Sequence, residues 1–141
     1  MADTKMIDVL LSRIVIREGS DRQFIYLSES GGSRGFQIVI GNNEACEIHR
    51  VVHGVESKRP LTHQLTLSAI EALGGRIDSI DIVDLKLNTF YAQIVLQTRD
   101  HEPAVIDARP SDAIALALRA KCRIRVAEEV LAEASRTPES S

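Results

Sequence analysis

The sequence predicts a single α+β domain in which a mixed, mostly antiparallel sheet packs against three to four helices. The chain has 141 residues, which fits one compact domain of about 100–150 residues. Some segments alternate apolar and polar residues or form short apolar runs, while others repeat apolar residues at helical spacing. These segments come in the order of three strands, two helices, three strands and a further helix, which is typical of α+β proteins. We expect the domain to span residues 6–134, with flexible termini at 1–5 and 135–141.

Three strands are expected in the first part of the chain. Residues 6–16 are rich in Ile, Val and Leu, so this strand is predicted to be buried on much of both faces. A turn at 18–21 joins it to a strand at 24–27 as a hairpin. A Ser/Gly-rich loop of low expected order at 28–35 separates that strand from the next, at 36–40.

Two helices follow. The first is expected to begin at Asn42 or Asn43, whose side chains can cap a helix, and to stop at Gly54. The second is expected to be capped by Thr62 and to end at Gly74. Its apolar positions at helical spacing are Leu65, Ala69 and Leu73, with Ile70 beside them.

The second part of the chain alternates again before it becomes helical. Strands are expected around 80–83, 90–96 and 104–106, with a hairpin turn at 86–88. Pro110 opens a third helix, because proline lacks only an N–H that is unbonded at that position. A short strand at 124–126 and a last helix at 127–134 complete the pattern.

Composition excludes several classes of protein. The net charge of −3 argues against a dedicated nucleic-acid coat protein, although local basic patches remain compatible with binding. Cys46 and Cys122 form no Cys-x-x-Cys pair, so neither a zinc ribbon nor a thioredoxin-like motif is present. The N-terminus lacks a signal-peptide pattern and no apolar run reaches the ~18 residues of a membrane span. We therefore expect a cytoplasmic protein with no membrane partner.

Self-association is a separate expectation. The third helix is rich in alanine, and the chain has a surplus of Ile, Val and Leu. A domain of this size cannot easily hide all of that apolar surface, so we predict a homo-oligomer.

The segment Asp107-Ala-Arg-Pro-Ser-Asp112 concentrates groups that bind charged ligands. A strand end delivers Asp107, and the start of the third helix presents free N–H groups beside Arg109, Ser111 and Asp112. Such a cluster can hold a phosphate, or a hydrated Mg²⁺ through its carboxylates. The alternative is structural: Asp112 caps the helix, and Asp107 pairs with Arg109 to lock the turn.

A second group of candidates lies between the first two helices. His49 and His53 share a helix face, but the metalloprotease motif His-Glu-x-x-His is absent. His63 is a candidate general acid or base, and its alternative role is a solvated residue in the first helical turn. The cationic residues that we expect to contact phosphate are Arg50, Lys58, Arg59 and, on the last strand, Arg123.

The acidic residues after the second helix add one more metal candidate. Asp78, Asp81 and Asp84 do not have the spacing of a calcium loop. Asp84 lies at a strand end near the hairpin, so it joins Asp107 and Asp112 as a candidate metal ligand.

Several of these segments occur together, in the same order, in one known family. Pro60-Leu-Thr-His-Gln-Leu65, Glu71-Ala-Leu-Gly74, Thr89-Phe-Tyr-Ala92, Val126-Ala-Glu-Glu-Val-Leu131 and above all the block from Asp107 to Arg119 resemble the bifunctional nuclease domain family. The resemblance covers about residues 6–134. It departs from related sequences at Leu87-Asn88, where they often place Asp-Gly, and at Ser30-Gly-Gly-Ser33, a loop expected to be shorter.

The resemblance implies a nuclease that hydrolyses phosphodiester bonds in DNA and RNA. On this interpretation Asp107, Arg109, Asp112 and His63 are the catalytic candidates, and Ser111 joins the substrate-binding ones. A divalent metal, Mg²⁺ or Mn²⁺, is the expected cofactor. The alternative function is a non-catalytic binding or regulatory module in which the same cluster stabilises the fold.

Overall fold

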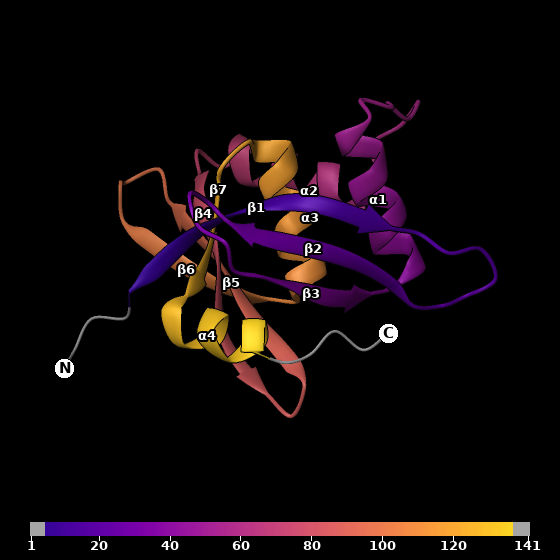
Figure 1. Ribbon diagram of the computed structural model, residues 1–141. Helices are drawn as coiled ribbons and strands as arrows, with labels where there is room; N and C mark the ends of the chain where they lie inside the picture. Colours follow the sequence, from indigo (N-terminus) through magenta and orange to yellow (C-terminus); the bar gives the residue numbers. More distant parts are fainter. Residues whose placement is uncertain (1–4, 137–141) are drawn as a thin grey trace.

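A computed structural model describes residues 5–136 as one seven-stranded sheet with four helices (Figure 1). The elements are β1 (Met6–Val15), β2 (Gln23–Glu29), β3 (Gly35–Ile40), α1 (Asn42–Val52), α2 (Thr62–Ala72), β4 (Arg76–Lys86), β5 (Thr89–Gln97), β6 (Pro103–Ala108), α3 (Pro110–Ala120), β7 (Arg123–Ala127) and α4 (Glu128–Arg136). The strand order is β3-β2-β1-β7-β4-β5-β6. The single-domain α+β prediction is confirmed.

The last strand of the chain, β7, lies in the middle of the sheet. It pairs antiparallel with β1 and parallel with β4, so it joins the β1–β3 meander to the β4–β6 meander. Arg125 on β7 donates two hydrogen bonds to the carboxylate of Asp81 on β4, at 2.8 and 2.7 Å. Asp81 is only 6% exposed, and such bidentate pairs are stronger and more directional than single contacts. The pair therefore holds the parallel junction in register.

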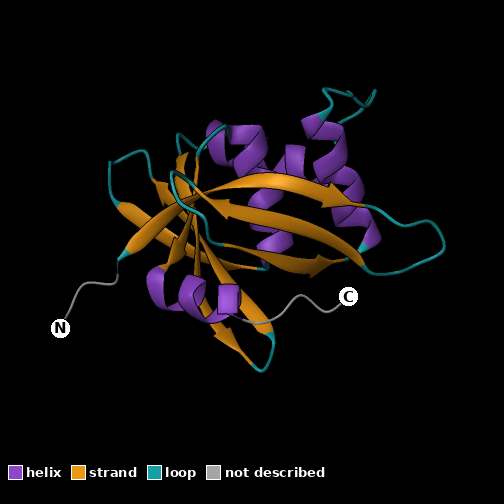
Figure 2. Cartoon of the chain, viewed as in Figure 1, coloured by secondary structure: helices purple, strands orange, loops and turns teal. Residues whose placement is uncertain are grey.

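The sheet is strongly curved. Phe36 on β3 and Phe90 on β5 stack with ring centroids 5.4 Å apart, although four strands lie between β3 and β5 in the sheet order. Register shifts at Ile77/Ser79 and Ile82/Asp84 interrupt β4, and such bulges bend a strand. Helices α1, α2 and α3 lie together on one side, while α4 stands apart and packs against β3, β4 and β7 (Figure 2).

Helix α3 is the central helix of the core. Its residues Ala113 to Ala117 are all buried, and it packs against α1, α2, β4 and β5. The alanines let neighbouring backbones approach closely, so this helix supplies core packing within one chain. The alanine-based argument for a homo-oligomer is therefore wrong, and that prediction depends instead on exposed apolar residues such as Leu73 and Val105.

Two burial predictions were also wrong. Strand β1 was predicted to be buried on much of both faces, but Val9 is its one buried residue and the other positions are exposed or half-buried. Of the apolar positions predicted for α2 and its C-cap, Leu65 is 61% and Leu73 75% exposed, whereas Ile70 packs against the core together with Leu67. Helical spacing marked an apolar stripe correctly but could not say which of two apolar stripes packs inward.

The helix starts differ from the prediction as well. Gly41 and Leu61, not Asn42 and Thr62, are the N-cap residues of α1 and α2, and neither helix has a side-chain cap. The Asn42 side chain accepts a hydrogen bond from Gln23 instead. Tertiary contact thus competes with local capping for the same polar group.

Turns and ends follow the local signals more closely. Leu87 and Asn88 adopt φ angles of 50° and 63°, so the β4–β5 hairpin closes with the left-handed turn expected of Asn. Helix α4 extends to Arg136, two residues beyond the predicted domain end, while residues 1–4 and 137–141 of the predicted termini lie outside the described residues. Cys46 and Cys122 are both free.

Among residues 5–136, no helix has the length and apolar character needed to cross a bilayer.

Two substitutions compare a buried position in α3 with an exposed position in α2. Ile114 is fully buried, so Ile114→Ala is expected to lower the free energy of unfolding by about 2–5 kcal/mol. Leu65→Ala on the exposed stripe of α2 is expected to change it by less than about 0.5 kcal/mol. Urea unfolding followed by circular dichroism measures both. A loss at Leu65 comparable to that at Ile114 would contradict the observed orientation of α2.

Candidate active site

One carboxylate connects two helices and a cationic side chain. Asp112 Oδ1 lies 2.8 Å from His63 Nε2, and Arg109 Nε donates to Asp112 Oδ2 at 3.1 Å. His63 belongs to α2 and Asp112 to α3, 49 positions later in the sequence. The structure thus brings together three of the four predicted catalytic residues, here called the Asp112 cluster: His63, Arg109 and Asp112.

The local sequence explains how α3 presents this cluster. Arg109 is the N-cap residue in an extended conformation, with φ −69° and ψ 146°, and Pro110 occupies the first helical position. Residues that precede proline avoid the helical region, so Arg109 turns away from the helix axis. Asp112 follows within the first turn, where the helix dipole favours a negative charge.

Helix α1 contributes a residue that the sequence did not single out. Glu44 Oε1 accepts a hydrogen bond from Arg109 Nη2 at 2.9 Å. Glu44 lies in the first turn of α1, and 65 positions separate it from Arg109. No local pattern indicates such a pair.

The electrostatics of the cluster favour a charged carboxylate. Partial burial raises the pKa of Asp112, but hydrogen bonds from His63 and Arg109 outweigh it, so that pKa lies below its ordinary value of 3.8. The hydrogen bonds to Asp112 and Glu44 raise the pKa of Arg109. The Asp112 cluster therefore contains a permanent anion and a permanent cation at neutral pH.

This arrangement sets the tautomer that a neutral His63 adopts. An ionised carboxylate only accepts hydrogen bonds, so Nε2 must carry the proton that faces Asp112. In the neutral ring Nδ1 is then left with a lone pair. An Asp–His pair of this kind can accept a proton from a water molecule while the carboxylate stabilises the imidazolium that forms.

The predicted metal ligands are not brought together. Asp107 is exposed on β6 and its side chain has no partner among residues 5–136. Asp84 on β4 pairs with Lys86 and accepts a bond from the N–H of Leu85. Within the described range, no group of three or more His, Cys, Asp or Glu residues could hold a metal ion.

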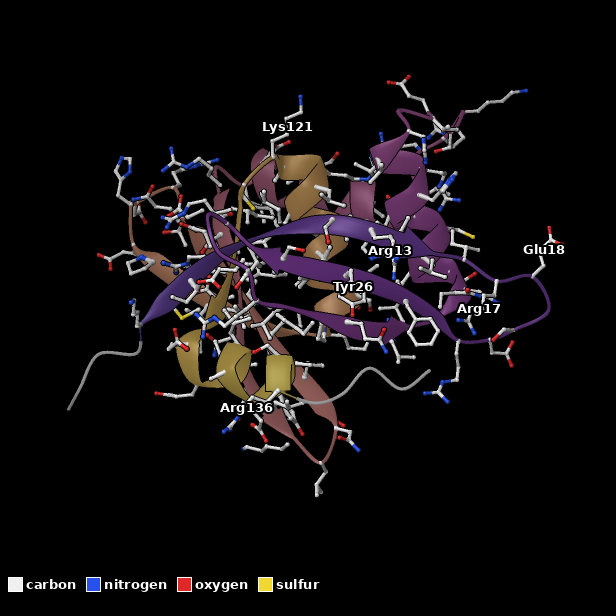
Figure 3. All side chains as sticks on the ribbon, in the orientation of Figure 1. Arg13, Arg17, Glu18, Tyr26, Lys121 and Arg136 are labelled. Carbon is white, nitrogen blue, oxygen red and sulfur yellow. The ribbon has the colours of Figure 1, made fainter. Side chains whose placement is uncertain are left out.

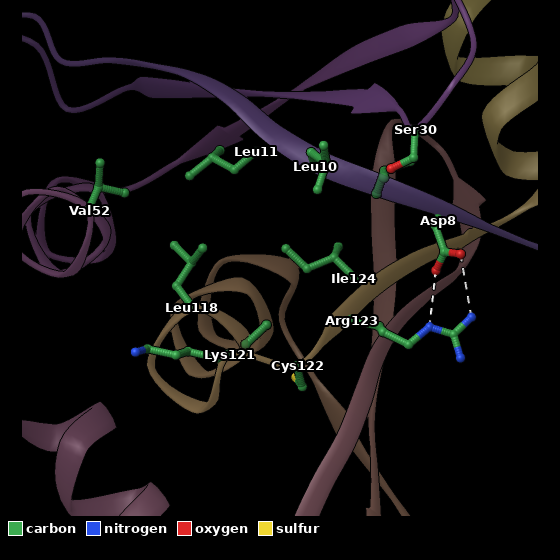
Figure 4. Close-up of a pocket in the computed structure, with 12 residues that line it drawn as sticks. Asp8, Leu10, Leu11, Ser30, Val52, Leu118, Lys121, Cys122, Arg123 and Ile124 are labelled. Atoms are coloured by element: carbon green, nitrogen blue, oxygen red, sulfur yellow. Dashed lines mark hydrogen bonds and ion pairs between the residues drawn. The ribbon is translucent and has the colours of Figure 1, made fainter.

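The predicted substrate-binding cations divide into paired and unpaired ones. Arg50 is engaged by Glu47, a 2% exposed carboxylate that also binds Arg119 of α3 at 2.6 Å. Arg123 bonds to Asp8 beside a cavity of about 740 Å³ with apolar walls (Figure 4). Lys58 and Arg59, in contrast, are exposed on the loop that leads into α2 and His63, with no side-chain partner in the described structure.

The outer surface of β1 and β2 carries arginines that the sequence did not single out. Arg13 lies over the ring of Tyr26, with 5.2 Å between its guanidinium carbon and the ring centroid (Figure 3). Arg17 lies over Phe24 in the same way, at 5.3 Å. Cation–π contact occupies one face of each guanidinium and leaves these side chains on the surface.

The pair His49 and His53 has the expected geometry without a third ligand. Their ring centroids are 4.2 Å apart on the exposed face of α1. Because no three-ligand group forms among residues 5–136, this pair provides no metal centre of the closed kind.

Comparison with known proteins gives one family and closely matching relatives. The sequence profile of the bifunctional nuclease domain matches residues 25–139. Two curated proteins, from strains CDC 1551 and H37Rv of Mycobacterium tuberculosis, are each 39% identical to the chain over 127 residues. The match covers 90% of this chain and 75% of each relative, and both relatives are described as uncharacterised.

The depressed pKa of Asp112 makes a prediction about acid stability. Because the folded pKa lies below 3.8, the ionised carboxylate stabilises the fold above that pH, and the contribution is lost as the pH falls through the folded pKa. The melting temperature of Asp112→Asn should therefore lie below that of wild type at pH 7, and this difference in melting temperature should shrink below about pH 4. Asp100→Asn, in an exposed turn, is the control. A difference that persists unchanged at pH 3 would contradict the assigned contacts.

Proposed function

Because the chain belongs to the bifunctional nuclease domain family, we propose that it is a nuclease that hydrolyses phosphodiester bonds in DNA and RNA. The observation that carries this proposal is the use of both oxygens of Asp112, one toward His63 and one toward Arg109. A base with a defined tautomer thus lies beside a cation suited to a phosphate.

In the proposed reaction His63 acts as the general base. Its Nδ1 takes a proton from water, and the water oxygen attacks phosphorus as the bond to the leaving oxygen breaks. The leaving oxygen takes up a proton from solvent, and His63 returns its own proton to solvent, so the products are a phosphate monoester and a hydroxyl. Arg109 stabilises the negative charge that builds on the non-bridging oxygens.

Loop and surface cations would hold the nucleic acid. Lys58 and Arg59 lie a few residues before His63 and have no side-chain partner in the described range. They can neutralise backbone phosphates on either side of the scissile bond, which would make binding dependent on salt.

A divalent ion remains part of the proposal. Mg²⁺ keeps most of its waters and needs only one or two carboxylates from the protein. The exposed carboxylate of Asp107 would supply one of them, without the three-ligand group that is absent from residues 5–136. When bound, such an ion supplies positive charge to the phosphate.

The nuclease assignment is tested with purified protein on labelled single- and double-stranded DNA and RNA, in Mg²⁺, Mn²⁺ and EDTA. His63→Gln keeps a donor toward Asp112 but loses the ring nitrogen that accepts a proton, so cleavage should fall about a hundredfold or more. Arg109→Ala should cost about 10²–10³-fold. Asp112→Asn should also lose most activity.

Matched variants guard against contamination and unfolding. His101→Asn, Arg76→Ala and Asp100→Asn change exposed residues of the same types and should cleave like wild type. Full activity in both His63→Gln and Asp112→Asn would exclude this site.

A non-catalytic binding module is the second candidate. It is favoured by the absence of a three-ligand metal group in residues 5–136 and by the full engagement of Asp112 in protein contacts. Nucleic-acid binding that weakens steeply with salt, without cleavage in Mg²⁺ or Mn²⁺, would support this function over hydrolysis.

A further inference from the structure

A cavity lies next to the Asp112 cluster and shares Arg109 with it. It has a volume of about 450 Å³ and is bounded by the end of β3, the β4–β5 hairpin and the start of α3. Sites for small molecules commonly measure about 300–1,000 Å³. The cavity therefore has room for a ligand larger than a single ion.

Two helices begin at this cavity. Gly41, the N-cap residue of α1, and Arg109, the N-cap residue of α3, both line it. Neither helix has a side-chain cap, although each is 11 residues long. The first N–H groups of a helix lack intrahelical acceptors and the dipole there is positive. The starts of both helices thus line one cavity, and the first turn of each also holds a carboxylate, Glu44 or Asp112, that bonds to Arg109.

A hydroxyl on a mostly buried residue provides an independent indication of a ligand. Ser111 lines the cavity and is only 6% exposed. Its hydroxyl has no hydrogen-bond partner among residues 5–136, and within that range the fully buried side-chain atom without a partner is Arg50 Nε instead. The Ser111 hydroxyl is therefore an accessible donor and acceptor at the cavity wall, available to a ligand there.

Arg109 adds a positive charge to the cavity wall. Its Nε and Nη2 atoms bond to Asp112 and Glu44, which leaves Nη1 without a partner among the described residues. Among the residues that line the cavity, Arg109 is the one cation and Asp21 the one carboxylate. The donors at the base of the cavity therefore face a ligand that accepts hydrogen bonds.

We propose that this cavity binds the phosphoryl group of a nucleotide, held by Ser111 Oγ, the free N–H groups of α1 and α3, and Arg109. The remaining wall includes Val39 and Phe90, which suit the sugar or base. The role of the cavity as the subsite for a phosphate beside the scissile bond rests on the proposed nuclease function. The binding of a nucleotide by the cavity does not.

Binding can be measured without hydrolysis, because adenosine 5′-monophosphate contains no diester bond. Titration of ¹⁵N-labelled protein is expected to give saturable shifts at the amides of Gly41, Ser111 and Asp112. Adenosine, which lacks the phosphate, should bind at least about tenfold more weakly. Inorganic phosphate should move the same amides.

Ser111→Ala is a near-isosteric test of the hydroxyl and is expected to weaken adenosine monophosphate binding about tenfold. Ser79→Ala is the matched control, since Ser79 is also buried but bonds to Asp81 away from the cavity. Because adenosine 5′-monophosphate has no diester bond, loss of its binding in Ser111→Ala is distinguishable from a failure of the proposed hydrolysis.

The outcomes divide cleanly. Competition by the diester adenylyl-adenosine would identify a backbone phosphate as the natural occupant, and binding of the monoester alone would identify a terminal phosphate. Both support a phosphoryl site. Equal affinity for adenosine and its monophosphate, an unaffected Ser111→Ala variant, or no shifts at millimolar nucleotide would each overturn the proposal.

Discussion

The insertion of β7 between β1 and β4 is the constraint on which the rest of the structure depends. This strand has only five residues, yet it is the sole link within the sheet between the two meanders. Its Ile124 and Val126 face the core, while Arg125 locks to Asp81 on β4. Since α3 precedes β7 by two residues, placing β7 also places α3 over the sheet and points its N-terminus at α1 and α2.

The packing of α3 and the chemistry of its start are two parts of one arrangement. The buried alanines allow α1 and α2 to approach α3 closely. At the far end of the α1–α3 contact, Glu47 is sequestered between Arg119 and Arg50. Removing one partner of a buried ion pair strongly destabilises a fold. The ion pairs of Glu47 therefore hold α1 in the position that brings Glu44 and Gly41 to Arg109. The candidate site is therefore rigidly supported from the core.

Arg109 is shared by the two sites that we propose. It bonds to Asp112 in the hydrolytic cluster and also lines the neighbouring cavity. One guanidinium can in this way orient consecutive phosphates of a chain, because its planar fork presents donors in several directions. This sharing also explains why a structural and a catalytic interpretation of the same ion pairs need not exclude each other.

Local signals in the sequence determined the strands, the helices, the Leu87–Asn88 turn and the Pro110 helix start, because each depends on neighbours within a few residues. The motif from Asp107 to Arg119 determined the family, and it predicted Arg109 and Asp112 as site residues, which lie in contact with each other in the structure. Only the tertiary structure decided that His63 and Glu44 meet these residues, that Asp84 and Asp107 do not, and that Leu65 faces outward. Those outcomes depend on which apolar faces are buried together across the whole chain, a sum of long-range packing free energies that no local pattern contains.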